Sequence, residues 1–339
     1  MRVARLHGVG DIRLADEPAP GVPPGHELVR VTAVGVCGSD LHWYAEAGIG
    51  DARLARPLVV GHECAGVIEG GPRDGEPVAI DPAIPCGACE LCWEGHRNLC
   101  LRIRFAGHGT QDGGLREYLA WPGELLHRLP DDFTPADGAM LEPLGVAIHA
   151  ADLGHLRVGA SVAVVGCGPI GLLLIQVARA AGAARIVAVD PLPHRLDAAR
   201  RLGADLAVTP AEAGDTNTLS ARAGGNPHGV HVAFEVAGAD EAVATAVNAA
   251  RPGARVVLAG IPSDDRTSFP AGHARRKGLT ILLSRRMKEV YPRAIELVSS
   301  GRVDVRSVVS DTFPLAEAGK AFAVAESRAG LKVIIGQKA

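Results

Sequence analysis

The stretch Ser161-Val-Ala-Val-Val-Gly166-Cys-Gly168-Pro-Ile-Gly171 decides the fold of this chain of 339 residues. Five residues of strand character lead into three glycines with the spacing Gly-x-Gly-x-x-Gly, and the apolar, alanine-rich run 172–182 has the composition of a helix. A strand, a glycine turn and a helix in this order form the phosphate-binding turn of a doubly wound sheet, where a pyrophosphate meets the helix N-terminus. The stretch therefore predicts a dinucleotide-binding domain.

A second apolar run, Arg185-Ile-Val-Ala-Val-Asp190, reads as the next strand and ends in an acid. A carboxylate at this place accepts hydrogen bonds from the adenosine ribose and repels a 2′-phosphate, so we expect NAD rather than NADP. Arg195 is a complication, because a nearby arginine can accommodate that phosphate. The predicted cofactor-binding residues are Gly166, Gly168, Pro169, Ile170, Gly171, Asp190 and Arg195.

Strands and helices alternate from about residue 153 onward, which indicates an α/β class with a doubly wound parallel sheet. Two helices are expected at 192–202 and 240–250, and a turn at 224–229 precedes the fourth strand. Six strands are predicted at 161–166, 185–190, 206–209, 231–236, 255–260 and 279–283.

The N-terminal part reads instead as a compact β-rich domain of short strands between Gly and Pro clusters. The C-terminal tail is predicted to contain a helix at 289–300, a segment at 303–313 that includes extended chain, a helix at 314–327 and a strand at 331–335. Because the six-strand set is complete before this tail, we expect the tail to pack on the N-terminal domain. The active site is then expected in the cleft between the two domains. The N-terminal strands are predicted at 3–6, 12–14, 28–35, 59–69 and 77–81.

Four cysteines lie close together in the run Cys86-Gly-Ala-Cys89-Glu-Leu-Cys92 and at Cys100. Four thiolates on a short loop suit tetrahedral Zn²⁺ and leave no position open for water, so the predicted site is structural. Disulfides are the alternative. The N-terminal residues 1–7 lack the apolar core of a secretory signal, and a chain of this size needs no covalent staples, so zinc is favoured.

An open metal site is predicted from two further segments. Gly35-Val-Cys37-Gly-Ser39-Asp40-Leu-His42 carries a thiol, a hydroxyl and an imidazole, and Gly61-His62-Glu63 follows an apolar run. Cys, His and carboxylate are zinc ligands, and a catalytic zinc uses three of them plus water or substrate. Each residue taken alone also has an explanation without a metal: the cysteine can be a buried packing residue, and the histidine can be a hydrogen-bonded loop residue. Cys37, His62, Glu63 and Glu142 are the candidates.

Composition limits the possible partners. A net charge of −3 gives no electrostatic reason to expect nucleic acid or an anionic membrane. The apolar runs are broken by Gly or Arg before they reach the length of a membrane span. We expect a cytoplasmic enzyme without nucleic-acid or membrane partners.

Together these segments resemble the zinc-containing medium-chain alcohol dehydrogenase family over nearly the whole chain, and most closely its sorbitol (L-iditol) 2-dehydrogenase-like polyol branch. The run Leu141-Glu142-Pro-Leu carries a Glu where the alcohol dehydrogenase branch commonly has Cys, and Arg286-Met-Lys-Glu-Val-Tyr-Pro292 also resembles the polyol branch. The resemblance implies a GroES-like catalytic domain at 1–147 and 286–339 and a Rossmann domain at 148–285. One departure is Trp43-Tyr44, where sorbitol-type enzymes often have the reverse order.

The resemblance also implies roles for individual residues. Cys37 and His62 are expected to bind a catalytic zinc, with Glu63 and Glu142 near it and the direct ligand left open between them. Asp40 is expected to orient the His62 ring. Ser39 and His42 match a proton relay, and Glu142 can act through a water. The substrate pocket is expected to include Trp43, Tyr44, Phe105, His108 and Arg286.

The expected reaction is reversible, NAD-linked oxidation of a secondary hydroxyl of a polyol to a ketose, with one catalytic and one structural zinc per chain. A relative of the same fold acting on L-threonine, an inositol-like ring or a simple secondary alcohol is the alternative. A zinc-independent quinone reductase would lack Cys37 and His62, and a non-enzymatic NAD-binding module would need no relay. The resemblance favours a tetramer, with a dimer possible.

Overall fold

The computed structural model describes residues 1–214 and 228–336, and the chain divides into two compact units. The first unit comprises Met1–Glu142, Tyr291–Ser299 and Val305–Ala339, and the second comprises Pro143–Val290 and Ser300–Asp304. The boundaries therefore fall five residues before the expected 147 and five after the expected 285. Residues 224–227 of the predicted turn lie outside the described part.

The second unit contains the predicted six-stranded sheet, and all its neighbouring strands are parallel. The order is β14-β13-β12-β15-β16-β17, which confirms the doubly wound topology. The direction of winding reverses between β12 and β15. The strands are β12 (Ser161–Val165), β13 (Arg185–Val189), β14 (Leu206–Val208), β15 (Val230–Glu235), β16 (Ala250–Leu258) and β17 (Thr280–Leu283).

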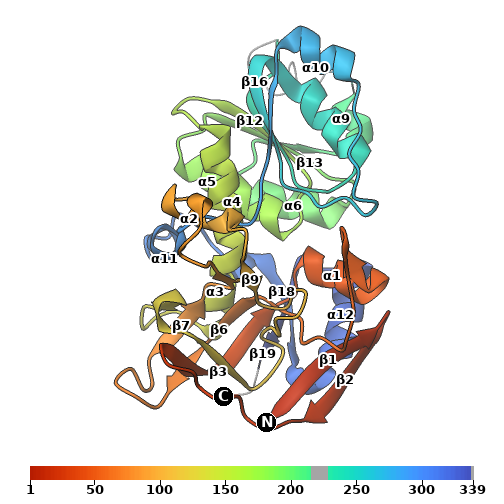
Figure 1. The fold of residues 1–339 in the computed structure, drawn as a ribbon. Coiled ribbons are helices and arrows are strands. Elements are labelled where there is room, and N and C mark those ends of the chain that lie inside the picture. Colours follow the sequence, from red (N-terminus) through yellow and green to blue (C-terminus); the bar gives the residue numbers. More distant parts are fainter. Residues whose placement is uncertain (215–227, 337–339) are drawn as a thin grey trace. The chain divides into compact units, whose positions relative to one another are not determined.

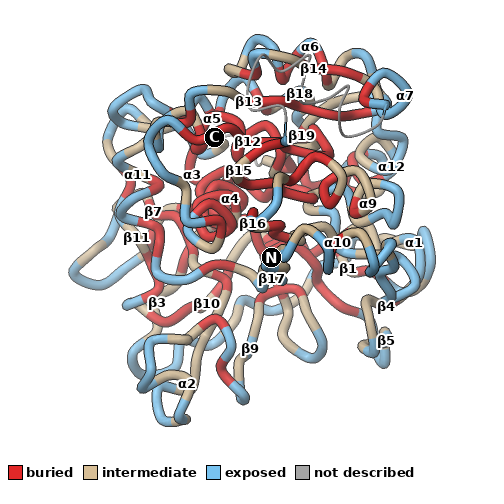
Figure 2. Tube along the Cα trace, turned by 90° about the horizontal axis from the view of Figure 1, so that it is seen from above, coloured by how far each residue is buried: buried red, intermediate tan, exposed pale blue. Residues whose placement is uncertain are grey.

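Helices cover both faces of this sheet (Figure 1). The α5 helix packs on β12 and β13, and α9 packs on β15. Right-handed crossovers that run in opposite directions from the sheet centre place these two helices on opposite faces. Figure 2 shows the consequence as a buried centre along β12, whose five residues are all buried. The helices are α4 (Leu141–Gly154), α5 (Pro169–Ala180), α6 (Pro193–Arg201), α7 (Pro210–Ala213), α9 (Asp240–Ala249) and α10 (Ala271–Lys277).

The first unit contains a seven-stranded sheet around β3 (His26–Gly35). The last described strand, β19 (Lys332–Gly336), pairs antiparallel with β3, so the chain's tail is part of the N-terminal domain. The remaining strands of the sheet are β6 (Glu63–Glu69), β7 (Pro77–Ile80), β10 (Tyr118–Pro122), β11 (Leu126–Arg128) and β18 (Val309–Pro314). Outside it lie β1 (Arg2–Gly8), β2 (Asp11–Asp16), β4 (Gly48–Ile49), β5 (Ala52–Arg53), β8 (Ala83–Ile84) and β9 (Arg104–Phe105).

Short helices complete the first unit. The 3₁₀ segments are Arg97–Leu99, Gly123–Leu125, Arg306–Val308 and Leu315–Glu317. The α-helices are α1 (Gly38–Glu46), α2 (Glu90–Trp93), α3 (Pro135–Ala139), α11 (Tyr291–Ser299) and α12 (Ala318–Ser327).

One predicted strand is wrong at its beginning. The strand expected at 59–69 starts only at Glu63, because Gly61 has a φ of +93° and Leu58 exchanges backbone hydrogen bonds with Leu6 of β1 instead. The predicted tail segment 303–313 does include extended chain, in β18, which follows a 3₁₀ turn at Arg306–Val308. The late start of β6 comes from tertiary partners, which sequence periodicity does not report.

No helix in the described ranges 1–214 and 228–336 is both long and apolar enough to cross a membrane.

Candidate active site and metal centres

The first candidate site is built at the N-terminus of α1. Cys37 is the N-cap residue of this helix, with extended backbone. The Asp40 carboxylate accepts a hydrogen bond of 3.0 Å from the Cys37 backbone N–H, which closes a capping box. Asp40 is only 1% exposed. The local helix start therefore fixes the cysteine and buries an acid beside it.

Asp40 also holds the second segment of the site. It accepts a hydrogen bond of 3.1 Å from the Gly61 N–H and lies 3.4 Å from His62 Nδ1. Burial alone would lower the pKa of His62, but the Asp40 carboxylate and Cys37 outweigh it and raise that pKa well above its usual range. With Nδ1 facing Asp40, the other ring nitrogen, Nε2, is available as a metal ligand.

Cys37, His62 and Glu63 each offer a ligand atom, and these atoms lie within 4.8 Å of one another. One thiolate, one imidazole nitrogen and one carboxylate oxygen are a donor set that Zn²⁺ accepts while keeping a position for water or substrate. Within residues 1–214 and 228–336, the other group of this kind is the four-cysteine loop. The residues present therefore fit an open zinc site.

Lys332 is a site residue that the sequence reading missed. Its ammonium group forms an ion pair with the Glu63 carboxylate and donates a hydrogen bond of 2.9 Å to the Val36 carbonyl. The two side chains are 2% and 1% exposed. Glu63 raises the pKa of Lys332 despite its burial, so the lysine stays charged. The signal in the sequence is slight: one lysine at the start of the apolar run Lys332-Val-Ile-Ile.

Glu142 lies at the beginning of α4 and is 4% exposed, but it stands outside the three-ligand group. Burial raises its pKa to about 7, with His62 lowering it and Glu63 raising it. The Glu142 carboxyl group therefore lies near enough to His62 and Glu63 to interact with their charges. Cys64, the residue after Glu63, is buried, at 2% exposure.

The two predicted relay residues make different contacts. Ser39 Oγ lies 3.5 Å from His62 Nε2, next to the predicted metal position. His42 Nδ1 lies 3.2 Å from Glu46 one helical turn further along α1. Both side chains come from the same helix, whose first turn carries Asp40.

The predicted pocket residues of the first unit belong to three different ring contacts. The Phe105 ring centroid lies 5.2 Å from that of His62, and Trp43 meets His108 edge-on at 5.5 Å. Tyr44 packs instead on Phe322 of α12, at 5.3 Å. Neighbours on α1 thus face different surroundings. Arg286 belongs to the second unit, and its role stays a prediction.

The four-cysteine loop has the geometry of a closed zinc site. All seven cysteines are free thiols, and the four Sγ atoms of the loop lie within 4.8 Å of one another. Cys89 Sγ lies 3.5 Å from Cys92 Sγ and 3.9 Å from Cys100 Sγ. Four sulfurs held 2.3 Å from one zinc in a tetrahedron are about 3.8 Å apart, so the separations match. Figure 2 shows α2 of this loop without buried residues.

Thiolate formation is favoured at Cys86 and Cys89 of this loop but not at Cys92, whose pKa burial raises to about 11. The Ala88 backbone N–H has the largest effect on Cys86, and together with the Arg102 guanidinium it lowers the pKa of Cys86 to about 6 against the opposing effect of burial. Arg102 donates to Cys86 Sγ at 3.4 Å. A loop that holds at least one thiol as thiolate near neutral pH is prepared for a metal cation.

The glycine turn of the second unit is built as its sequence predicts. A Cβ at Gly171 would lie 1.9 Å from the Gly166 carbonyl oxygen, so the close approach requires glycine. Gly168 is the N-cap of α5, with Pro169 at its first turn. A Cβ at Gly168 would meet only Arg195, 3.7 Å away. The helix N-terminus thus keeps room for a phosphate.

Asp190 follows β13 and is 3% exposed. Its carboxylate accepts hydrogen bonds from the backbone N–H groups of Cys167 at 2.7 Å and Leu192 at 2.9 Å. Each carboxylate oxygen keeps a further lone pair. The acid is therefore fixed in orientation and still able to accept ribose hydroxyls.

Comparison with known proteins gives matches over both units. The family profile "Alcohol dehydrogenase GroES-like domain" matches residues 23–131, and "Zinc-binding dehydrogenase" matches residues 169–300. Sorbitol dehydrogenase of Bacillus subtilis is 34% identical over 321 residues, which are 93% of this chain and 90% of that protein. A probable D-xylulose reductase A of Arthroderma otae is 37% identical over 340 residues, or 97% and 95%.

Solved structures give the same result. L-idonate 5-dehydrogenase from Escherichia coli superposes with a TM-score of 0.89 at 28% identity, covering 99% of this chain and 97% of that one. The chain belongs to the zinc-binding dehydrogenases of the medium-chain dehydrogenase/reductase family. The expected fold, with a GroES-like domain and a Rossmann domain, and the expected enzyme class are thereby confirmed.

Proposed function

We propose that this enzyme reversibly oxidises a secondary hydroxyl of a polyol of the sorbitol, iditol or xylitol type to a ketose, with NAD⁺ as the hydride acceptor. The observation that carries the proposal is the group of Cys37, His62 and Glu63 beside the buried Glu142. The relatives named above for sorbitol and xylulose support the substrate class.

Cys37, His62 and Glu63 would hold the catalytic zinc. Zinc at such a site supplies Lewis acidity, which lowers the pKa of a substrate hydroxyl. Asp40 fixes the His62 ring, and Lys332 balances the charge of Glu63. A carboxylate in place of a second thiolate keeps the metal more electrophilic, which suits a substrate with adjacent hydroxyls.

The proton of the substrate hydroxyl leaves through residues of the chain. Ser39 would receive it and pass it toward His42, and the position of Ser39 Oγ beside His62 Nε2 supports this role. Glu142 can serve the same purpose through a water molecule, because a carboxyl group with a pKa near 7 both accepts and releases protons at neutral pH.

Asp190 supports NAD over NADP, because its buried carboxylate repels a 2′-phosphate. The four thiolates of Cys86, Cys89, Cys92 and Cys100 would hold the second, structural zinc. A tetrameric assembly and a cytoplasmic location complete the proposal, and sedimentation velocity tests the first of these.

Initial rates with NAD⁺ and NADP⁺ test the function. The panel contains sorbitol, xylitol, L-iditol and galactitol, with L-threonine and simple secondary alcohols for comparison. We expect NAD⁺-linked oxidation of at least one polyol that a zinc chelator abolishes. Activity confined to L-threonine or simple alcohols would overturn the substrate assignment and leave the zinc assignment intact, whereas a preference for NADP⁺ would contradict the role of Asp190.

A further inference from the structure

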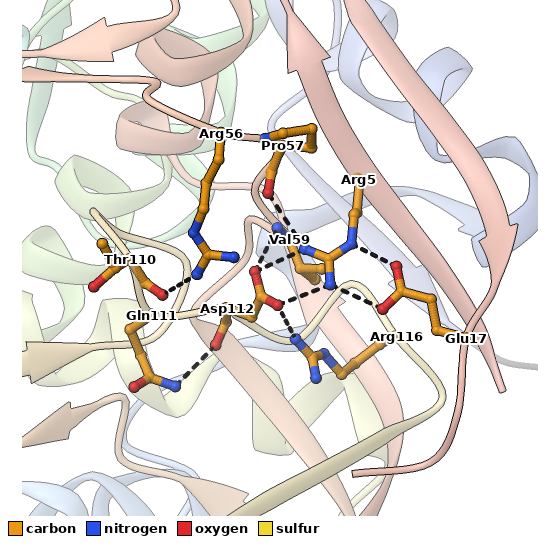
Figure 3. A network of polar contacts seen from close by, with 9 residues as sticks. All are labelled: Arg5, Glu17, Arg56, Pro57, Val59, Thr110, Gln111, Asp112 and Arg116. Atoms are coloured by element: carbon orange, nitrogen blue, oxygen red, sulfur yellow. Dashed lines mark hydrogen bonds and ion pairs between the residues drawn. The ribbon is translucent and has the colours of Figure 1, made fainter.

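Asp112 lies outside the proposed catalytic site and is unusually well hydrogen-bonded. Arg5 donates to both of its oxygens, at 3.0 Å and 2.9 Å, and Arg116 Nη2 lies 2.9 Å from Oδ2. A third hydrogen bond comes from the backbone N–H of Val59, 3.1 Å from Oδ1, whereas Arg116 contributes an ion pair. Figure 3 shows the two guanidinium groups and the backbone N–H converging on this one carboxylate.

Arg5 is itself fixed from a second direction. Its Nε and Nη2 donate to the two oxygens of Glu17, at 2.5 Å and 2.8 Å, and its Nη1 also reaches the Pro57 carbonyl at 3.3 Å. Two arginines and two acids make the cluster neutral. Bidentate pairs of this kind fix geometry as well as charge, because both planar groups are oriented. Asp112 is therefore held in one position.

The backbone that Asp112 holds leads directly to His62. Residues 57–62 belong to no strand, and Gly61 within them has a left-handed φ of +93°. Their carbonyls accept hydrogen bonds from the chain that follows Asp112: Gly113 donates to Val59, Leu115 to Val60 and Gly114 to Gly61. Two carboxylates hold N–H groups of the segment: Asp40 holds Gly61, and Asp112 holds Val59.

We propose that Asp112 is a positioning residue for His62, acting through the Val59 N–H to hold the segment that presents this imidazole to the catalytic metal. The proposal rests on the proposed function only in taking His62 as a metal ligand. Partners that orient metal ligands change metal affinity by roughly 10- to 100-fold when removed. Because Asp112 acts on the backbone three residues before the ligand, we expect the lower end of that range.

The geometry requires a carboxylate at this position. An asparagine that kept Oδ1 toward the Val59 N–H would turn its amide N–H groups toward the two guanidinium groups at the Oδ2 position, so we expect the side chain to leave this position and the Val59 N–H to lose its acceptor. Asp112→Asn is therefore the variant of choice, since it changes one atom and nearly no volume. Arg5→Lys is the second variant, because lysine keeps the charge and loses the two-pronged contact.

Glu117 provides a matched control on the same stretch of chain. Its carboxylate accepts from the backbone N–H of Arg2 and from the Arg2 guanidinium, both at 2.8 Å. It thus makes the same kinds of contact as Asp112, but to β1 and not to residues 57–62. Glu117→Gln removes a comparable ion pair from the same unit.

The experiment is metal release from the full chain loaded with Co²⁺. The two sites differ in their number of thiolates, so their thiolate-to-metal absorption bands differ, and release to a chelator can be followed for each site separately. Temperatures well below each variant's Tm are used. A His62→Ala variant identifies the bands of the open site.

We expect Asp112→Asn to release metal from the open site about 10-fold faster, Arg5→Lys to lie between it and the wild type, and the four-thiolate site to be unchanged. Glu117→Gln should stay within about twofold of the wild type. Equal acceleration at both sites, or a lowered Tm with unchanged release, would show that Asp112 only stabilises the fold. If the wild-type chain shows no bands that His62→Ala removes, the open site itself fails, and the proposal fails with it.

Discussion

Glu63 and Lys332 show how a single residue far along the chain enters the active site. Both side chains are almost fully buried, and their ion pair lies one residue from His62. A buried charge that loses its partner is costly, because the remaining ion has neither water nor a counter-charge. Gly35 completes the fit, since a Cβ there would lie 2.0 Å from the Glu63 carboxylate.

Replacing this lysine tests the pairing. In the metal-free protein, Lys332→Met should lower the free energy of unfolding by about 3–5 kcal/mol, because it leaves the Glu63 carboxylate buried and without a counter-charge. Lys332→Arg keeps the charge, so it should lower the free energy of unfolding by less than Lys332→Met does. Denaturant titrations of the three proteins give the comparison, and a Met variant as stable as the wild type would show that Glu63 is not charged in the folded chain.

The catalytic residues could be predicted from the sequence better than the residues that position them. Cys37, His62 and Asp40 come in short motifs whose chemistry is legible from residue type and spacing. In the sequence, Lys332 looks like a solvent-exposed charge at the start of a strand. Only the pairing of β19 with β3 brings it to the site. Asp112 likewise has no motif, because the partners of its carboxylate, Arg5, Val59 and Arg116, come from three separate places in the chain.

At the scale of elements, Asp137 joins the start of α3 to the tail. It forms a capping box with Thr134, and it accepts hydrogen bonds from Arg306 Nε at 3.0 Å and from Nη2 at 2.7 Å. Burial raises the pKa of this carboxyl group, but Arg306 and the Thr134 N–H outweigh burial, so the net pKa lies below its usual value. The carboxylate is therefore the form that stabilises the fold.

The sign of this pKa change predicts a pH dependence. A folded pKa below the unfolded value of about 3.9 means that the stabilisation is complete at neutral pH and is lost as the pH falls through the folded value. Asp137→Asn should cost roughly 1–3 kcal/mol at pH 7. The difference in free energy of unfolding between this variant and the wild type should become smaller below about pH 4. Thermal melts between pH 7 and pH 3 measure it, and a constant gap would contradict the assignment.

Elements with strong local signals could be predicted, and those set by distant partners could not. The six parallel strands are apolar runs between clear turns, and the structure reproduces them. The helix α1 was not expected, because its nine residues carry the zinc-site motif and little helical periodicity. The strand expected from residue 59 fails at Gly61, where the turn depends on contacts with β1 and with residues 113–115.

At the scale of the whole molecule, one unit carries two candidate metal sites, one open and one closed, and the other unit carries the dinucleotide turn. The closed site has four thiols, and the open site has one thiol, one imidazole and one carboxylate. Removing a ligand from either site should therefore remove one zinc, with different consequences for activity.

Zinc content per chain, measured together with NAD⁺-linked polyol oxidation, tests this account most directly. The wild type should contain two zinc ions. Cys37→Ser should contain one and lose activity, whereas Cys89→Ser should also lose one zinc and mainly lose stability. A wild-type chain with one zinc that Cys37→Ser retains, or polyol oxidation that survives in that variant, would contradict the central claim that Cys37 and His62 hold a catalytic metal.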